Sequence, residues 1–121
     1  MENTLFIQLL IGPLFLVLAI IFKLFPPKSI NNIYGYRTSY SMRSQAVWDE
    51  ANRFSCNLMV GTGVIVIIAQ IISHFMLEVG LSLTVPIVLL VVLLIAIIPI
   101  TERHLRKNFD KEGNPHSAIN K

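Results

Sequence analysis

The sequence predicts an all-α membrane protein with three transmembrane helices, in a single domain that covers residues 1–121. The composition is the first reason, because 54% of the residues are hydrophobic and only 14% are charged, whereas about 25% charged residues is average for a soluble domain. The mean hydropathy is +0.65. The second reason is that three apolar runs, at residues 5–22, 56–76 and 81–100, contain no Asp, Glu, Lys or Arg. Each run is close to the roughly 20 residues that cross the hydrocarbon core of a bilayer.

The first run is expected to be retained as a helix rather than removed as a secretory signal, because no basic segment precedes it and no small-residue cleavage site follows it. Gly12 and Pro13 lie inside this run, and a proline there predicts a kink that packs against a neighbouring helix. Pro26 and Pro27 end the helix, because a proline disfavours helical geometry in the residue before it.

The second helix is expected to begin at Ser41, whose hydroxyl can cap its first turn. Apolar or small residues then recur at three- and four-residue spacing without a proline, which predicts one helix from about Met42 to Met76. The link from Leu77 to Gly80 is short, so the second and third helices form an antiparallel hairpin, with Gly80 as the C-terminal stop of the second helix. The third helix is expected to extend into the tail at residues 101–121.

The distribution of charge predicts the orientation of the helices. All ten basic residues lie either between the first and second runs, at residues 23–55, or after the third run. With three spans, these two segments fall on the same side of the membrane, and the opposite side holds only Glu2 and Glu78. Because basic segments stay in the cytoplasm, the N-terminus is expected outside and the C-terminus inside.

The cytoplasmic connection carries most of the polar residues that are candidates for a site. Gly35 lies between two tyrosines, which is typical of a position with a positive φ or a close backbone approach. Arg37 has a planar guanidinium able to bind carboxylate, phosphate or carbonyl oxygens bidentately. One interpretation is a small polar binding pocket at the membrane surface. The residues assigned to it are Asn32, Tyr34, Gly35, Arg37, Thr38, Ser41, Trp48, Asn52 and Arg53.

The alternative interpretation is that the aromatic residues of this connection form an interfacial belt, while Arg37 binds lipid phosphate or pairs with Asp49 or Glu50. Arg37 can also stack on Trp48 and brace the connection against the following helix. If the residues form a fixed site, Arg37→Lys and Trp48→Ala are expected to abolish function, whereas Tyr40→Phe is expected to be nearly silent. If they form a belt, Arg37→Lys keeps the charge and costs little.

The same connection resembles the SdpI family of bacterial membrane proteins, whose members share an Asn, Gly, Arg-Thr, Ser and Trp series between two membrane helices. The residues that carry the resemblance are Pro26, Pro27, Lys28, Asn32, residues 34–38, Ser41, Trp48 and residues 51–53. The chain is similar to a single three-helix module of that family. The resemblance implies immunity to a sporulation-delaying peptide toxin, a form of bacteriocin resistance, and a multi-pass location in the bacterial plasma membrane.

Several classes of function are disfavoured by the sequence. It contains no nucleophile with a base, no catalytic carboxylate pair and no phosphate-binding loop, so an enzyme is not expected. No cofactor or metal is expected, since His74, His104 and His116 do not have the spacing of paired metal ligands. Nucleic-acid binding is not expected either, because the basic residues flank apolar runs, where membrane orientation explains them.

The leading hypothesis is therefore a non-catalytic binding protein that engages a membrane-active peptide toxin or a cytoplasmic regulator. A small transport or channel subunit and an assembly factor for a membrane complex are the alternatives. Ion-coupled transport is disfavoured because the deep membrane core holds no ionisable group. The small residues at 61–63 permit close helix contact, within the chain or in a homo-oligomer, and the pattern leaves both open.

Overall fold

The computed structural model describes residues 2–31, 35–110 and 112–114, and its helices are α1 (Glu2–Leu24), α2 (Gln45–Met76) and α3 (Val79–Asn108). Each of the three is long and apolar enough to cross a membrane. The prediction of an all-α membrane protein with three transmembrane helices is confirmed. Which side of the membrane each end occupies stays a prediction.

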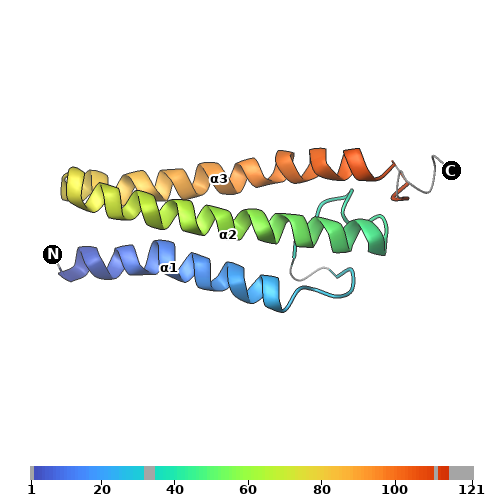
Figure 1. Cartoon of the computed structure of the whole chain (residues 1–121), viewed down its shortest axis with the longest axis horizontal. Coiled ribbons are helices and arrows are strands. Elements are labelled where there is room, and N and C mark those ends of the chain that lie inside the picture. The colour runs from blue at the N-terminus through green and yellow to red at the C-terminus, as the bar shows by residue number, and fades with distance from the viewer. Residues whose placement is uncertain (1, 32–34, 111, 115–121) are drawn as a thin grey trace.

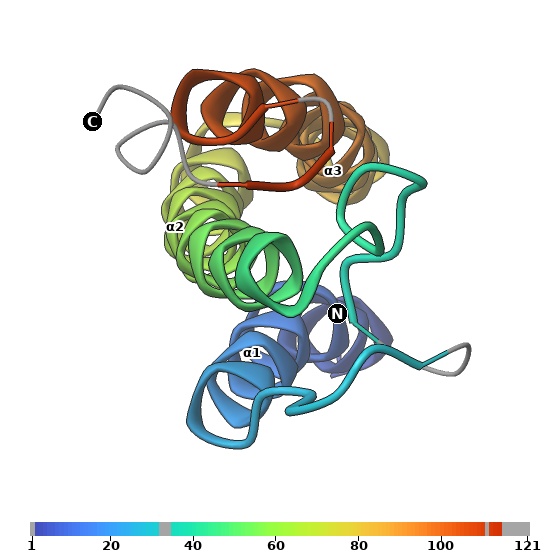
Figure 2. The ribbon, with the colours of Figure 1, turned by 90° about the vertical axis from the view of Figure 1, so that its right-hand side faces the viewer.

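The three helices run side by side along the long axis of the molecule (Figure 1). The connection between α1 and α2 lies at the same end as the last turn of α3, and the first turn of α1 lies at the other end. Viewed from the connection end, α2 is placed between α1 and α3 (Figure 2). In agreement with this view, α2 packs along both other helices, whereas α1 and α3 touch little.

The start of α2 corrects the sequence prediction. Its N-cap is Ser44 rather than Ser41, and the Ser44 side chain accepts a hydrogen bond from the backbone N–H of Val47. The hydroxyl of Ser41 is unavailable as a helix cap because it is engaged in the connection, where it accepts a hydrogen bond from the N–H of Thr38. From Gln45 onward the helix is unbroken, which confirms the predicted continuation into the second span.

The length of α2 exceeds what the membrane requires. At about 1.5 Å per residue its 32 residues extend about 48 Å, compared with roughly 30 Å for the hydrocarbon core. The excess lies at the connection end, where the helix continues beyond the apolar run at residues 56–76. This extension is the surface on which the connection is folded.

The turn between α2 and α3 also differs from the prediction. The backbone turns at Leu77 and Glu78, both in extended conformation, and α3 begins at Val79. Gly80 therefore lies in the first turn of α3, where its carbonyl accepts a hydrogen bond from the Thr84 hydroxyl, and it does not stop α2. The predicted antiparallel hairpin is present, because a two-residue turn of extended backbone reverses the chain without a glycine.

Small residues bring α1 and α2 into close contact. A Cβ built on Gly12 would lie 2.0 Å from the side-chain oxygen of Gln70, and one built on Gly63 would lie 3.0 Å from the Leu16 side chain. The Gln70 amide donates a hydrogen bond to the carbonyl of Gln8 at 2.7 Å. The large side chains on the outer faces of the helices are apolar and exposed, as a lipid-facing surface requires.

A cluster of buried hydrophobic residues lies at the connection end rather than midway along the helices. It joins the connection to the extensions of α2 and α3, and its members are Tyr40, Val47, Ala51, Leu105 and Phe109. The connection is thus packed as a folded element and not as a surface loop.

Candidate functional site

The first half of the connection is fixed on α2 by two side chains. The indole N–H of Trp48 donates to the carbonyl of Pro27 at 2.8 Å, and the Gln45 amide donates to the carbonyl of Lys28 at 2.6 Å. Trp48 is fully buried. The belt interpretation is therefore wrong for Trp48, because an interfacial side chain would lie on the lipid-facing or headgroup-facing surface.

Asn52 connects α2 to the turn at Gly35. Its side-chain oxygen accepts a hydrogen bond from the backbone N–H of Tyr36 at 2.7 Å, and its amide donates to the carbonyl of Trp48 at 2.9 Å. Gly35 has a φ of 111°, and a Cβ there would lie 2.8 Å from the Asn52 oxygen and 2.8 Å from Pro27. Both reasons for which the sequence favoured glycine at position 35 are thus present, the positive φ and the close approach.

The second half of the connection is fixed on α3 by Glu102. Its Oε1 accepts hydrogen bonds from the Thr38 hydroxyl at 2.6 Å and from the Tyr36 hydroxyl at 2.8 Å. Burial, and then the neighbouring Glu102 carboxylate, raise the pKa of the Tyr36 phenol, so this group stays protonated at neutral pH and acts as the hydrogen-bond donor. Glu102 is not among the residues that the sequence predicted for the site. A signal was present, because this acid lies among the basic residues of the tail.

Tyr40 joins the connection to the end of α3, and these contacts change the effect that we expect of Tyr40→Phe. Its hydroxyl donates to the carbonyl oxygens of Phe109 at 2.9 Å and Asp110 at 2.5 Å, and the side chain is buried. Tyr40→Phe leaves these carbonyls without that donor, so it is not expected to be silent. Arg43 lies 4.6 Å above the Tyr40 ring, which places a cation–π contact here.

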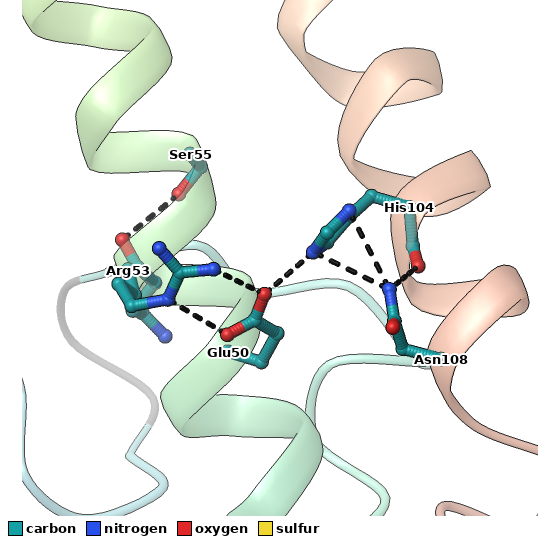
Figure 3. A network of polar contacts seen from close by, with 6 residues as sticks. Glu50, Arg53, Ser55, His104 and Asn108 are labelled. Atoms are coloured by element: carbon teal, nitrogen blue, oxygen red, sulfur yellow. Dashed lines mark hydrogen bonds and ion pairs between the residues drawn. The ribbon is translucent and has the colours of Figure 1, made fainter. Parts of the chain in front are cut away.

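A polar network on the neighbouring faces of α2 and α3 contains another of the predicted residues, Arg53 (Figure 3). Arg53 binds both carboxylate oxygens of Glu50, through Nε at 2.8 Å and Nη2 at 2.5 Å. The same carboxylate lies 2.5 Å from Nε2 of His104, and the His104 ring stacks on Phe54 with the ring centroids 3.9 Å apart. This network ties α2 to α3, and it gives Arg53 a structural partner.

An apolar cavity of about 300 Å³ lies on the membrane side of the connection. Gly35 and Tyr36 cover it, and its walls come from all three helices, with Phe22 on α1, Met59 on α2 and Ile97 on α3. Cavities of this size are at the lower end of the range of small-molecule sites, roughly 300–1,000 Å³. The connection thus has one side that lines the cavity, through Gly35 and Tyr36, and an exposed side that carries Arg37, which does not line the cavity.

The structure joins four of the predicted site residues, Thr38, Ser41, Trp48 and Asn52, into one hydrogen-bonded unit through the backbone of Tyr36. Gly35, a fifth predicted residue, packs closely against Asn52. Arg37 is attached to this unit, with its side chain exposed. Arg53 lies in the separate network with Glu50. Asn32 and Tyr34 lie outside the described residues. Among the residues that the structure does describe, no group of His, Cys, Asp and Glu side chains could hold a metal ion.

Comparison with known proteins matches more than half of the chain to one family. Residues 28–101 match the model of the SdpI/YfhL protein family. A 55-residue segment is 53% identical to the uncharacterized protein YfhL of Bacillus subtilis (strain 168), and it covers 46% of this chain and 50% of that protein. The match thus spans half the length of that relative. No solved structure matches the chain. The family match contains most of the connection, α2 and most of α3, whereas Pro27 and Glu102 lie just outside it.

Proposed function

Because this chain belongs to the SdpI/YfhL protein family, we propose that it is a non-catalytic immunity protein of the bacterial plasma membrane, which protects its host against a membrane-active peptide toxin. The exposed side of the connection is the recognition surface. With the orientation that the basic residues predict, this surface faces the cytoplasm. It engages either the peptide itself or a cytoplasmic regulator of the response to the peptide.

One observation supports this proposal most directly. The residues on both sides of Arg37 are fixed, Tyr36 through Asn52 and Glu102, and Thr38 through Ser41 and Glu102. The backbone at Arg37 is therefore held in place, and the residue is exposed. A preorganised group loses less conformational entropy on binding than a mobile one. A planar donor in a fixed position suits a carboxylate or a carbonyl of a partner.

The experiment compares strains that carry variants of the gene in place of the wild type. Deletion is expected to sensitise the host to a secreted peptide, and Arg37→Lys is expected to fail to restore protection because an ammonium cannot reproduce the planar fork. Arg103→Lys is the matched control, since Arg103 is an exposed arginine on the α3 extension. The amount of each variant in the membrane is measured by immunoblot.

One result distinguishes a cytoplasmic regulator from the peptide as the partner, and another tests the interpretation that Arg37 faces lipid. If the regulator is the partner, Arg37→Lys changes the expression of a reporter that responds to the peptide as well as survival. Full protection by Arg37→Lys at normal abundance would contradict the proposal and favour a lipid-facing role for Arg37. Trp48→Ala is not a useful test of recognition, because truncating a buried tryptophan costs about 3–5 kcal/mol and so affects the fold.

A further inference from the structure

A second hollow adjoins the apolar cavity, on the side of α1. This groove of about 670 Å³ lies between the end of α1, residues 26–28 of the connection and the first turns of α2. Three basic residues from three different segments line it, namely Lys23, Lys28 and Arg53. One acidic residue, Asp49, lines it as well. The groove is therefore positively charged, although Arg53 is already paired with Glu50.

The charge of the groove comes from its two lysines. Asp49 accepts a hydrogen bond from Gln45 at 2.7 Å. Within the described ranges of the chain, Lys23 and Lys28 are not paired with a carboxylate, and both are exposed. Two ammonium groups without acidic partners attract an anion.

The position of Lys28 is set by the fold. Its carbonyl is bound by Gln45, and the carbonyl of the preceding Pro27 is bound by the buried Trp48. The backbone at Lys28 is thus anchored to α2, directly beside the end of α1 that carries Lys23. A lysine on a mobile loop would lose more conformational entropy on binding an anion.

The groove and the cavity share a wall. Phe22, Pro27, Asn52 and Cys56 line both. A basic surface therefore lies next to an apolar space, at the end of the apolar run at residues 5–22, which is the level of the lipid headgroups. An anion site next to an apolar space at the membrane interface is suited to bind an anionic amphiphile.

We propose that the groove and the cavity bind an anionic phospholipid, with its phosphate between Lys23 and Lys28 and an acyl chain in the cavity under Gly35 and Tyr36. This site lies on the side of the connection that lines the cavity, and Arg37 lies on its exposed side. The inference is therefore separate from the proposed immunity function. The acyl chain of the bound lipid packs against Gly35 and Tyr36 of the connection. It fills the space that the side chains of the protein leave open.

Trp48 provides the measurement, because it is the only tryptophan of the chain. Its ring lies 3.3 Å from the Cβ position of Gly35, which covers the cavity. The full-length protein is reconstituted in phosphatidylcholine vesicles that contain a small, fixed fraction of phosphatidylglycerol. Bromine, a short-range quencher, is placed on the acyl chains of one lipid or of the other at equal mole fraction. Brominated phosphatidylglycerol is expected to quench Trp48 several-fold more than brominated phosphatidylcholine.

A pair of charge-matched variants tests the assignment to the groove. Lys23→Gln with Lys28→Gln is expected to remove the preference for phosphatidylglycerol. Arg103→Gln with Lys107→Gln removes the same charge from exposed positions of α3. This control variant is expected to keep the preference for phosphatidylglycerol. All four side chains are exposed, so the fold is kept, and circular dichroism verifies this. Equal quenching by the two lipids, or an equal loss in both double variants, would overturn the proposal.

A further experiment tests whether the ligand is the lipid or free inorganic phosphate, since both carry a phosphate group. Inorganic phosphate is added to the vesicles at a series of concentrations, with chloride at matched ionic strength as the control. The preference for brominated phosphatidylglycerol is expected to fall equally in the two salts, as general screening predicts. A selective loss in phosphate would identify the free anion as the ligand and overturn the assignment to a lipid.

Discussion

At position 35, both the backbone conformation and the packing of neighbouring residues favour glycine. Its φ of 111° lies in a region that residues with a Cβ rarely adopt, and the space beside it is filled by Asn52 and Pro27. Gly61, in contrast, lies within α2 and has no atom within 4 Å of the position that a Cβ would take. The two glycines therefore form a matched pair for mutation.

Gly35→Ala is expected to lower the free energy of unfolding by about 1–3 kcal/mol, the usual cost of a strained backbone conformation. Gly61→Ala is expected to be neutral or to stabilise the protein by up to about 1 kcal/mol, because alanine favours a helix over glycine. Both are measured by denaturant titration in detergent micelles, with helix content as the signal. An unchanged stability in Gly35→Ala would show that the connection is not packed on Asn52 as described.

Tyr36 makes the docking of the connection sensitive to high pH. Burial, followed by Glu102, raises the pKa of its phenol from the ordinary value of 10.0. The unfolded chain therefore loses this proton first as the pH rises. The stability that Tyr36 contributes is fully present below the unfolded-state pKa, and it is lost as the pH rises above that value towards the folded-state pKa.

The wild type is accordingly expected to be less stable at about pH 11 than at about pH 8, and Tyr36→Phe is expected to lose less over the same interval. Burial also raises the pKa of Tyr40, so a smaller pH dependence remains in the variant. The free energy of unfolding at each pH provides the comparison. An identical decline in wild type and Tyr36→Phe would exclude the phenol of Tyr36 as the titrating group.

At the scale of the elements, the start of α2 is joined to the end of the chain. The Ser44 hydroxyl caps the helix by accepting a hydrogen bond from the N–H of Val47, and it donates one to the carbonyl of Gly113 at 2.8 Å. One side chain thus serves both the helix terminus and the segment that follows α3. Ser39, which precedes the helix in the same connection, is exposed.

Ser44→Ala is expected to destabilise the protein by about 1 kcal/mol, as the loss of a helix cap usually does. Ser39→Ala is the control, and its effect is expected to stay within about 0.5 kcal/mol. Urea titration in micelles, with Trp48 fluorescence as the reporter, measures both. Equal effects of the two substitutions would mean that the cap contributes nothing to stability.

At the scale of the whole molecule, the orientation in the membrane can be tested independently of any function. The basic connection and tail are expected in the cytoplasm. In a Cys56→Ala background, a cysteine at Lys28 or Lys107 is expected to resist an impermeant thiol reagent in intact cells. A cysteine at Glu78, in the turn between α2 and α3, is expected to react. Labelling of the first two positions in intact cells would reverse the topology, and opened membranes verify that each cysteine is reactive.

From the sequence alone follow the number of helices and their approximate spans, whereas the region of the candidate site stays a prediction. The hydrocarbon core imposes a length of about 20 apolar residues and excludes unpaired backbone groups, so a membrane helix is visible in a local stretch of sequence. Gly35 could also be recognised locally, because a positive φ restricts residue type at a single position. The motif residues around it were found through a resemblance to a family.

Only the tertiary structure decided how these residues are used. Ser41 and Ser44 are both able to cap a helix, and the choice depends on which hydroxyl the folded connection occupies. Glu102 meets Thr38 across 64 positions of sequence, and His104 meets Glu50 across 54. Such pairs have no local periodicity that could reveal them. They form because α2 and α3 extend beyond the membrane together, and the space between their ends and α1 is filled by the connection.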